Sequence, residues 1–269
     1  MTNEKFNLGE VQIEAIVNGI GELMILLSRG DGDASTFDSF TPLLNEKGYK
    51  TVAINRRGYA GSSGPLENLT LHDLANDVAG VIRLLGEGPV HILGWAFGNR
   101  IARCVAENHP QLVKSVILLA AGGKVAPNHE SSKYYAILAK PGSSREERLE
   151  ALRFLYFSPS TDIKIVAKAF KGGRISPEER QKHRKATEAH GKANLATPIM
   201  EWWNGGKAPM LVIQGLDDKT AVPENGLILK EENGDRVKLV NIEKAGHFLV
   251  NEKPERVVKE IVSFLKSFD

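Results

Sequence analysis

One stretch of the sequence, Val90 to Ile101, fixes the local shape of the chain more tightly than any other. It reads Val-His-Ile-Leu-Gly-Trp-Ala-Phe-Gly-Asn-Arg-Ile. An apolar run ending in Gly94, a turn closed by Gly98 and a helical pattern from Ile101 onward predict a strand that turns sharply into a helix. Glycine is needed two residues before and two residues after the central Ala96, because the two backbones approach too closely there for a Cβ atom.

Apolar runs alternate with helical patterns on both sides of this turn. Strands are predicted at residues 11–18, 22–27, 51–54, 89–93, 114–121, 210–214 and 236–242, and helices at residues 37–44, 70–86, 97–109, 224–231 and 257–265. This rhythm predicts right-handed crossovers and a mainly parallel sheet, with the partly alternating first run as an outer antiparallel strand. Residues 123–206 instead show only helical patterns, at 134–138, 146–157, 162–170, 177–190 and 198–203.

Length and composition restrict the class of protein. The 269 residues suffice for one large α/β domain, or for a core with a lid, and a net charge of +2 gives no reason to expect nucleic acid. The first residues contain no apolar signal segment and no run is long enough to span a membrane, so we expect a cytoplasmic protein with no membrane partner. Cys104, the single cysteine, follows Ile101 at helical spacing and predicts a buried structural thiol.

The turn at residues 94–98 resembles the G-x-S-x-G nucleophile elbow of the α/β-hydrolase superfamily, with Ala96 where that motif has serine. The loop at residues 55–62 is similar to the family's D-x-R-G-x-G-x-S stretch, from which Asn55 and Ala60 depart. The resemblance covers almost the whole chain. It implies an α/β-hydrolase fold, with a core domain of residues 1–122 and 207–269, a twisted and mostly parallel sheet flanked by helices, and a helical lid (cap) of residues 123–206.

The resemblance also implies an acid and a base, in the family's order of nucleophile, acid and histidine. Residues 215–223 (Gly-Leu-Asp-Asp-Lys-Thr-Ala-Val-Pro) follow a predicted strand and resemble the family's G-x-x-D-x-x-x-P, with one extra residue before the proline. This comparison places the acid at Asp218 and leaves Asp217 as the alternative. His247, in the Gly-His loop after the last predicted strand, is the expected base.

Two backbone N–H groups form the oxyanion hole in this fold, one following the nucleophile and one in the loop after the third strand. The resemblance assigns them to Phe97 and Asp31, with Gly30 as the alternative to Asp31. The family usually reads His-Gly in that loop, whereas this chain has Arg29-Gly30. We expect Arg29 to form a structural ion pair with Asp31 or Asp33, in preference to binding a substrate carboxylate.

Aromatic residues are frequent in the predicted lid, and most should belong to its own core. Trp202 and Trp203, just before the return to the sheet, are expected to form one wall of an apolar substrate pocket. Tyr135 and Phe248 are the further candidates for substrate contact. No pair of histidines or cysteines has metal-ligand spacing, so neither a metal nor a cofactor is expected. A homodimer is left open at the level of the sequence.

Two hypotheses compete for Ala96, because a methyl group cannot attack a carbonyl carbon. The first is a serine hydrolase for an apolar carboxylic ester or lactone, such as a serine esterase or lactonase, whose nucleophile is replaced by Ala96 in an inactive form that still binds substrate. The second is a native alanine in a non-catalytic ligand-binding or receptor protein on a hydrolase scaffold. The ordered acid, base and oxyanion loop favour the first, because acyl transfer accounts for all three together.

Two related chemistries are alternatives to a serine nucleophile. Dehalogenases and epoxide hydrolases of this fold use aspartate at the elbow, but they resemble G-x-D-W-G or H-G-x-P patterns. Phe97 and the proline-free stretch at residues 29–32 depart from both patterns. Cofactor-independent oxygenases share the fold and its His-Asp pair, and they stay open as a third hypothesis.

Overall fold

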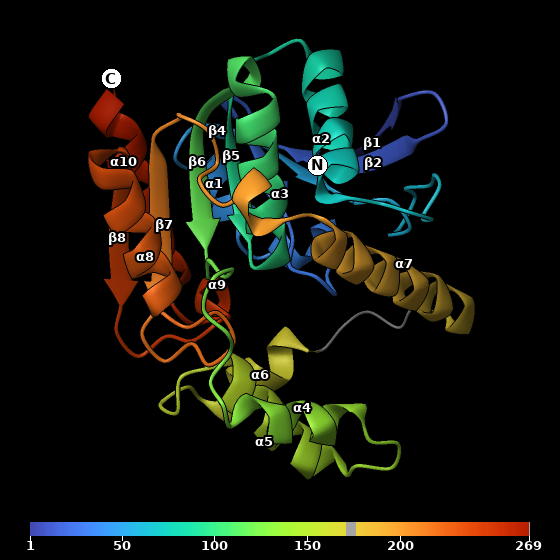
Figure 1. Cartoon of the computed structure of the whole chain (residues 1–269), viewed down its shortest axis with the longest axis vertical. Coiled ribbons are helices and arrows are strands. Elements are labelled where there is room, and N and C mark those ends of the chain that lie inside the picture. The colour runs from blue at the N-terminus through green and yellow to red at the C-terminus, as the bar shows by residue number, and fades with distance from the viewer. Residues whose placement is uncertain (171–175, 269) are drawn as a thin grey trace. The chain divides into compact units, whose positions relative to one another are not determined.

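The computed structural model describes residues 1–170 and 176–268 (Figure 1). The chain forms two compact units. Unit 1 comprises Met1–Leu118 and Ile175–Met210, and unit 2 comprises Leu119–Arg174 and Leu211–Asp269. Of the helices in the described residues, none is long and apolar enough to cross a membrane.

The strands form an eight-stranded sheet in the order β1-β2-β4-β3-β5-β6-β7-β8. Their bounds are β1 Thr2–Asn7, β2 Gln12–Asn18, β3 Glu22–Leu27, β4 Tyr49–Ile54, β5 Val90–Trp95, β6 Val113–Leu119, β7 Met210–Gly215 and β8 Val237–Ile242. Strand β2 pairs antiparallel with β1 and β4, whereas β3 pairs parallel with both β4 and β5. The predicted fold class, a mostly parallel sheet flanked by helices, is confirmed.

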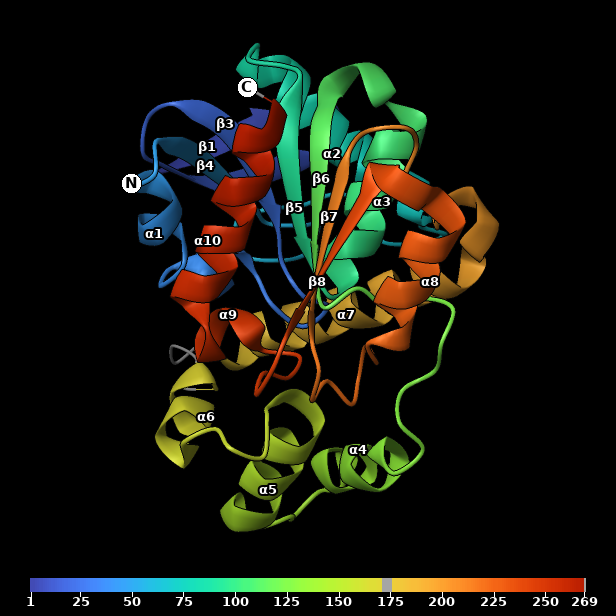
Figure 2. The same ribbon diagram turned by 90° about the vertical axis from the view of Figure 1, so that its left-hand side faces the viewer.

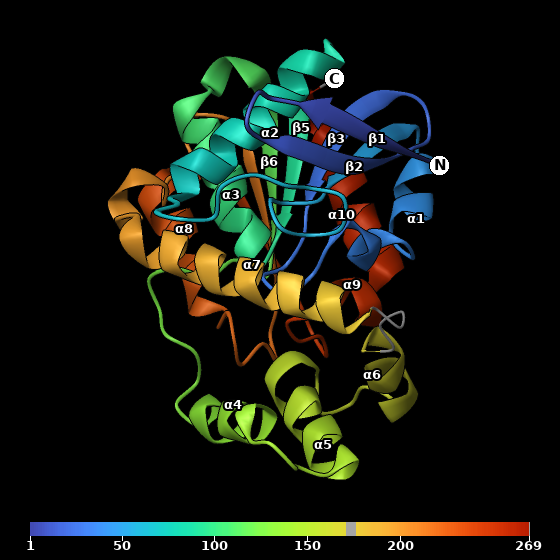
Figure 3. The same cartoon turned by 90° about the vertical axis from the view of Figure 1, so that its right-hand side faces the viewer.

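The helices follow the strands in the alternation that the sequence predicts. They are α1 Thr41–Asn45, α2 Leu71–Leu85, α3 Phe97–Asn108, α4 Ser131–Ala139, α5 Arg145–Tyr156, α6 Ile163–Ala169, α7 Pro177–Ala196, α8 Glu224–Asn233, α9 Leu249–Glu252 and α10 Pro254–Leu265, with 3₁₀ turns η1 Ala34–Phe37, η2 Pro110–Leu112, η3 Ile199–Glu201, η4 Gly234–Arg236 and η5 Lys266–Phe268. In unit 1, α2 and α3 lie side by side on one face of the strands and α1 lies on the other (Figures 1 and 3).

The core of unit 1 explains why its central strands are continuous apolar runs. Every residue of β5 is buried, as are five of the six residues of β3, and strands buried on both faces are typically continuous apolar runs. The predicted buried thiol is confirmed, since Cys104 lies inside α3 and is fully buried. Burial raises the pKa of this thiol to about 12, so it is an inert packing residue at neutral pH.

Two elements near the N-terminus differ from the sequence-based expectation. Strand β1 is absent from the predicted strands, because only Phe6 among its six residues is buried and the rest of this edge strand lacks an apolar pattern. The helix predicted at residues 37–44 is split into η1 and the short α1. Pro42 lies in the first turn of α1, where its missing N–H is tolerated, but it cannot continue a helix from the preceding turn.

The helical block predicted as a single lid is divided between the two units. Helices α4, α5 and α6 belong to unit 2, in which they follow one another in sequence (Figure 2). Helix α7 and the turn η3 belong to unit 1, in which α7 passes the N-terminal ends of α2 and α3 (Figure 3). Residues 171–175 of the block lie outside the described residues. The role of residues 123–206 as a lid therefore stays a prediction.

Thr70 caps α2, and this cap gives a stability prediction. The Thr70 hydroxyl accepts from the backbone N–H of Asp73, and the Asp73 carboxylate accepts from the backbone N–H of Thr70. Thr70→Ala should lower the free energy of unfolding by about 1 kcal/mol, because the backbone N–H of Asp73 loses its side-chain acceptor. Urea titration measures the change. Thr70→Ser keeps the hydroxyl, and an equal loss in that variant would contradict the cap.

Candidate active site

The predicted elbow is present between β5 and α3. Ala96 lies between the two elements with φ 51° and ψ −112°, a backbone conformation that residues other than glycine seldom adopt. A Cβ at Gly94 would lie 2.5 Å from the Cα of Asn99, and a Cβ at Gly98 would lie 2.1 Å from the carbonyl oxygen of Leu27. Both glycines are therefore required by close backbone contacts, and the residue at position 96 is held in a strained turn.

The loop after β3, at residues 28–32, lies beside this elbow in unit 1. A Cβ built on Gly30 would lie 3.5 Å from the Cβ of Phe97, so the two segments expected to donate to an oxyanion are neighbours. Arg29 and Asp31 form an ion pair, as the sequence predicts. Asp31 is thus a structural partner of the Arg29 guanidinium. The same guanidinium also lies over the Trp95 ring. The donor roles of Phe97 and Asp31 stay predictions.

The loops that follow β7 and β8 hold an aspartate and a histidine in contact within unit 2. His247 Nδ1 lies 2.8 Å from Asp218 Oδ2, and the other Asp218 oxygen accepts from the backbone N–H groups of Thr220 and Ala221, each at 2.8 Å. Asp218 is 2% exposed and His247 is 6% exposed. Because Nδ1–H is directed at the carboxylate, Nε2 is the nitrogen that can take a proton from a reacting group.

Asp217, the alternative acid, is arranged differently. Its backbone N–H donates to the carbonyl oxygen of Ala245, and the residue is partly exposed. The structure thus brings Asp218, and not its neighbour, into hydrogen-bond contact with the histidine.

Glu252 of α9 supports the histidine loop, and no motif in the sequence points to it. Its carboxylate accepts from the backbone N–H of Gly246 at 2.7 Å, from the backbone N–H of Ser158 at 2.8 Å and from the hydroxyl of Thr161. Burial raises the pKa of Glu252, and these hydrogen bonds oppose that rise. The carboxylate therefore ties the residue before His247 to the turn that joins α5 and α6.

Aromatic side chains surround the histidine in unit 2. The Tyr156 ring lies 5.7 Å from the His247 ring between centroids, and 5.2 Å from the ring of Phe248. Phe248 is 2% exposed and also packs on Phe157 and Phe170. The sequence marks Tyr156 only as one of many lid aromatics, because nothing in its local pattern shows that the end of α5 reaches the histidine loop.

The remaining predicted substrate residues are placed as follows. In unit 2, the Tyr135 hydroxyl lies 3.0 Å from the hydroxyl of Thr220, next to the acid loop. In unit 1, Trp202 and Trp203 are 3% and 1% exposed, and the Arg103 guanidinium lies 4.6 Å and 4.9 Å from their ring centroids. The tryptophans are thus packed on a cation. Their role as a pocket wall stays a prediction.

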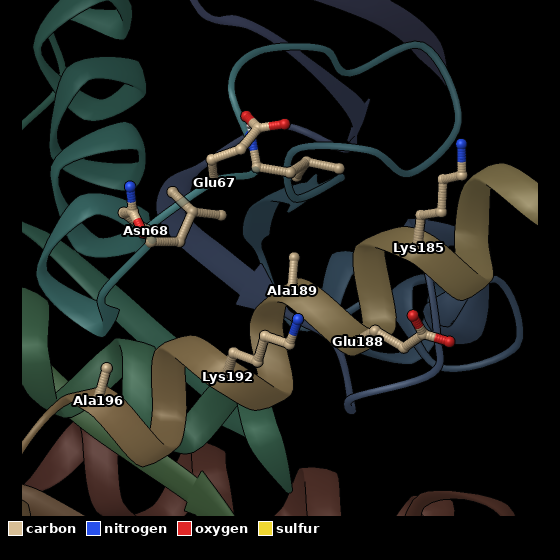
Figure 4. A pocket seen from close by; sticks show the side chains of 9 residues that line it. Glu67, Asn68, Lys185, Glu188, Ala189, Lys192 and Ala196 are labelled. Carbon is tan, nitrogen blue, oxygen red and sulfur yellow. Dashed lines mark hydrogen bonds between the residues drawn. The ribbon is translucent and has the colours of Figure 1, made fainter.

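A hollow of about 630 Å³ lies between α7 and the segment at residues 66–69 in unit 1 (Figure 4). Its lining residues are Leu66, Glu67, Asn68, Leu69, Lys185, Glu188, Ala189, Lys192 and Ala196. None of the predicted site residues is among them, and within the part of the chain that the structure describes no histidine, cysteine or serine lines it. The hollow therefore lacks the groups that acyl-transfer chemistry needs.

Comparisons with known proteins place this geometry in context. A family model described as "alpha/beta hydrolase fold" matches residues 16–154. The 2-(acetamidomethylene)succinate hydrolase of Mesorhizobium japonicum is 23% identical over 98% of this chain and 95% of its own length. The 2-hydroxy-6-oxononadienedioate/2-hydroxy-6-oxononatrienedioate hydrolase of Burkholderia vietnamiensis is 24% identical, covering 96% of this chain and 92% of its own. Among solved structures, a thermophilic esterase from Thermogutta terrifontis has a TM-score of 0.76 at 18% identity, with 99% of each chain covered.

Proposed function

Because the chain belongs to the alpha/beta hydrolase fold family, we propose that it carries the site of a serine hydrolase for carboxylic esters or lactones, inactivated by Ala96. The observation that carries the proposal is the buried Asp218–His247 contact at 2.8 Å. Burying a carboxylate and an imidazole is costly unless their hydrogen bonds are satisfied, and here the second carboxylate oxygen takes two further N–H groups. Such a pair is what general-base activation of a nucleophile requires.

The mechanism assigns one step to each group. With serine in place of Ala96, the hydroxyl oxygen attacks the ester carbonyl while His247 takes its proton and Asp218 stabilises the resulting imidazolium. The backbone N–H groups of Phe97 and Asp31 donate to the oxyanion. His247 then gives the proton to the leaving alcohol, and a water activated by the same histidine releases the acid from the acyl-enzyme.

The proposed substrate is an ester or lactone with an apolar acyl or alkoxy group. Aromatic rings around the histidine loop, those of Tyr156 and Phe248 among them, offer apolar contact. The names of the two curated relatives denote substrates that carry carboxylates. A substrate panel should therefore pair each neutral ester with an analogue that has a free carboxylate at its far end.

A second candidate function is a non-catalytic ligand-binding protein on the same scaffold. Ala96 itself favours it, because the strained backbone of the elbow is kept at a residue that has no nucleophile. We propose that such a protein would hold an ester or a related carboxyl compound, as the hydrolase would, and the two functions differ in what a restored nucleophile would do.

We therefore expect the chain with Ala96 to bind an ester from this panel and to leave it intact. Isothermal titration measures binding, and chromatography of the recovered ligand measures hydrolysis. Loss of a triad nucleophile leaves only oxyanion and binding contributions, so turnover should be close to background. If no ester, lactone or carboxylate analogue binds at millimolar concentration, both candidate functions lose their support.

A further inference from the structure

Arg56 is a buried cation whose donors reach the backbone of the loop at residues 28–32. Its Nη1 donates to the carbonyl oxygen of Ser28 at 2.7 Å, and its Nη2 donates to those of Arg29 at 3.0 Å and Gly30 at 2.9 Å. The side chain is 3% exposed, and burial lowers its pKa from the usual value. The same guanidinium lies 5.1 Å from the ring centroid of Phe97. One cation thus contacts both segments of the expected oxyanion hole.

The contacts to carbonyl oxygens also orient the N–H groups of the loop. In a trans peptide the C=O of one residue and the N–H of the next lie in one plane and point in opposite directions. The Gly30 carbonyl accepts from Arg56 and from the Tyr59 hydroxyl, the latter at 2.7 Å. The N–H of Asp31 therefore points away from Arg56, on the opposite side of the same peptide plane.

His190 of α7 contacts the third nitrogen of this guanidinium, Nε. Its Nδ1 lies 3.4 Å from Arg56 Nε and accepts from it, and the histidine is 1% exposed. The imidazole ring is nearly parallel to the ring of Phe97, at 15°, with 6.1 Å between the centroids. Burial, followed by the positive charge of Arg56, lowers the pKa of His190 to about 3. The imidazole is therefore neutral at physiological pH, as an acceptor must be.

Helix α7 has a second connection to the same loop. The hydroxyl of Tyr59, which donates to Gly30, lies 2.7 Å from the hydroxyl of Thr187. His190 and Thr187 are adjacent on one face of α7, three residues apart. Two side chains of this helix thus reach the partners that orient the Gly30–Asp31 peptide.

We propose that His190 is a positioning residue for the oxyanion hole, acting through Arg56, and that α7 sets the geometry of the hole in this way. The inference rests on the proposed function for the role of the Asp31 and Phe97 N–H groups. Because the guanidinium is rigid and planar, an acceptor at Nε fixes the plane of the two nitrogens that hold the loop carbonyls. Without that acceptor the plane can rotate, and the Asp31 N–H rotates with it.

The test uses three variants in a chain that carries Ala96→Ser. His190→Phe keeps a buried ring on Phe97 but removes the acceptor, and His190→Gln keeps an acceptor. Lys192→Ala on the same helix is the control, because Lys192 is exposed and has no described bond to Arg56 or Tyr59. Loss of one oxyanion donor costs about 100- to 1000-fold in kcat, so misplacing one should lower kcat about 10- to 100-fold with KM little changed. His190→Gln should recover most of the loss, and Lys192→Ala should show none.

Two measurements on the chain with Ala96 separate this inference from the proposed function. Amide hydrogen exchange at residues 30–32 should accelerate in His190→Phe but not in His190→Gln or Lys192→Ala, whether or not the serine form hydrolyses esters. Nitrogen-15 NMR of the unsubstituted chain should show His190 neutral, with the proton on Nε2, until the pH approaches about 3. A proton on Nδ1, or unchanged kcat and exchange in a folded His190→Phe, would overturn the inference. If the serine form proves inactive while the exchange result holds, only the catalytic part fails.

Discussion

Ala96→Ser is expected to raise ester turnover about a million-fold, which is the usual cost of removing a triad nucleophile. The expectation follows from the elbow, where the backbone already has the conformation of the nucleophile position. Serine adds one oxygen to the alanine side chain, so the change should leave the contacts of Gly94 and Gly98 with neighbouring backbone intact. The measurement is kcat/KM on aryl esters, alkyl esters and lactones for both chains. The free energy of unfolding of the two chains should first be shown to be equal.

The matched control for this prediction is Ala96→Ser combined with His247→Ala. The double variant has the hydroxyl but no base, and it should return to the background rate because serine alone is a weak nucleophile. A folded serine form that is no faster than the alanine form across the panel would favour the ligand-binding or oxygenase alternatives. Activity that survives loss of His247 would show that another group is the base.

Asp218→Asn, in the chain that carries Ala96→Ser, should lower kcat about 10⁴-fold. The asparagine carbonyl can accept from the N–H groups of Thr220 and Ala221 as the carboxylate does. Its NH₂ group would then face His247 Nδ1, which must become the acceptor. The proton moves to Nε2 in that tautomer, and Nε2 can no longer take the proton of the nucleophile.

Asp217→Asn is the matched comparison, one residue away in the same loop. Asp217 reaches Ala245 through its backbone N–H, which the substitution keeps, so kcat should stay within a few-fold of the parent chain. The pH dependence of kcat/KM gives the second readout for both variants. A larger loss in Asp217→Asn than in Asp218→Asn would show that the acid is misassigned.

The parts of the fold that could be predicted from the sequence are those with a local signature. The elbow is specified by Gly94 and Gly98, because their spacing around one central residue is typical of a tight strand-to-helix turn. Asp218 and His247 could be proposed because each lies in a loop that follows a recognisable apolar strand and resembles a motif of the α/β-hydrolase family. Strand β1 has no such signature, because Phe6 is the only buried residue among its six. The strand is defined instead by its antiparallel pairing with β2.

The supporting contacts of the site could not be predicted, because their partners are far apart in the sequence or are joined only by the folded chain. Arg56 and His190 are 134 residues apart, and Gly246 meets Glu252 only because α9 folds back onto the histidine loop. Helical periodicity likewise predicts the helices between residues 123 and 206 without showing what each one packs against. The packing partners of each helix depend on tertiary contacts, which place α4–α6 in unit 2 and α7 in unit 1.

The most direct test of the proposed acyl-enzyme is intact-protein mass spectrometry of both chains after mixing with an activated aryl ester. The Ala96→Ser chain should gain the mass of the acyl group before the steady state, on the peptide that contains position 96, and hydroxylamine should remove it. The Ala96 chain should show no such gain. A folded Ala96→Ser chain that hydrolyses the ester without an adduct, or an equal adduct on both chains, would contradict a serine nucleophile at this elbow.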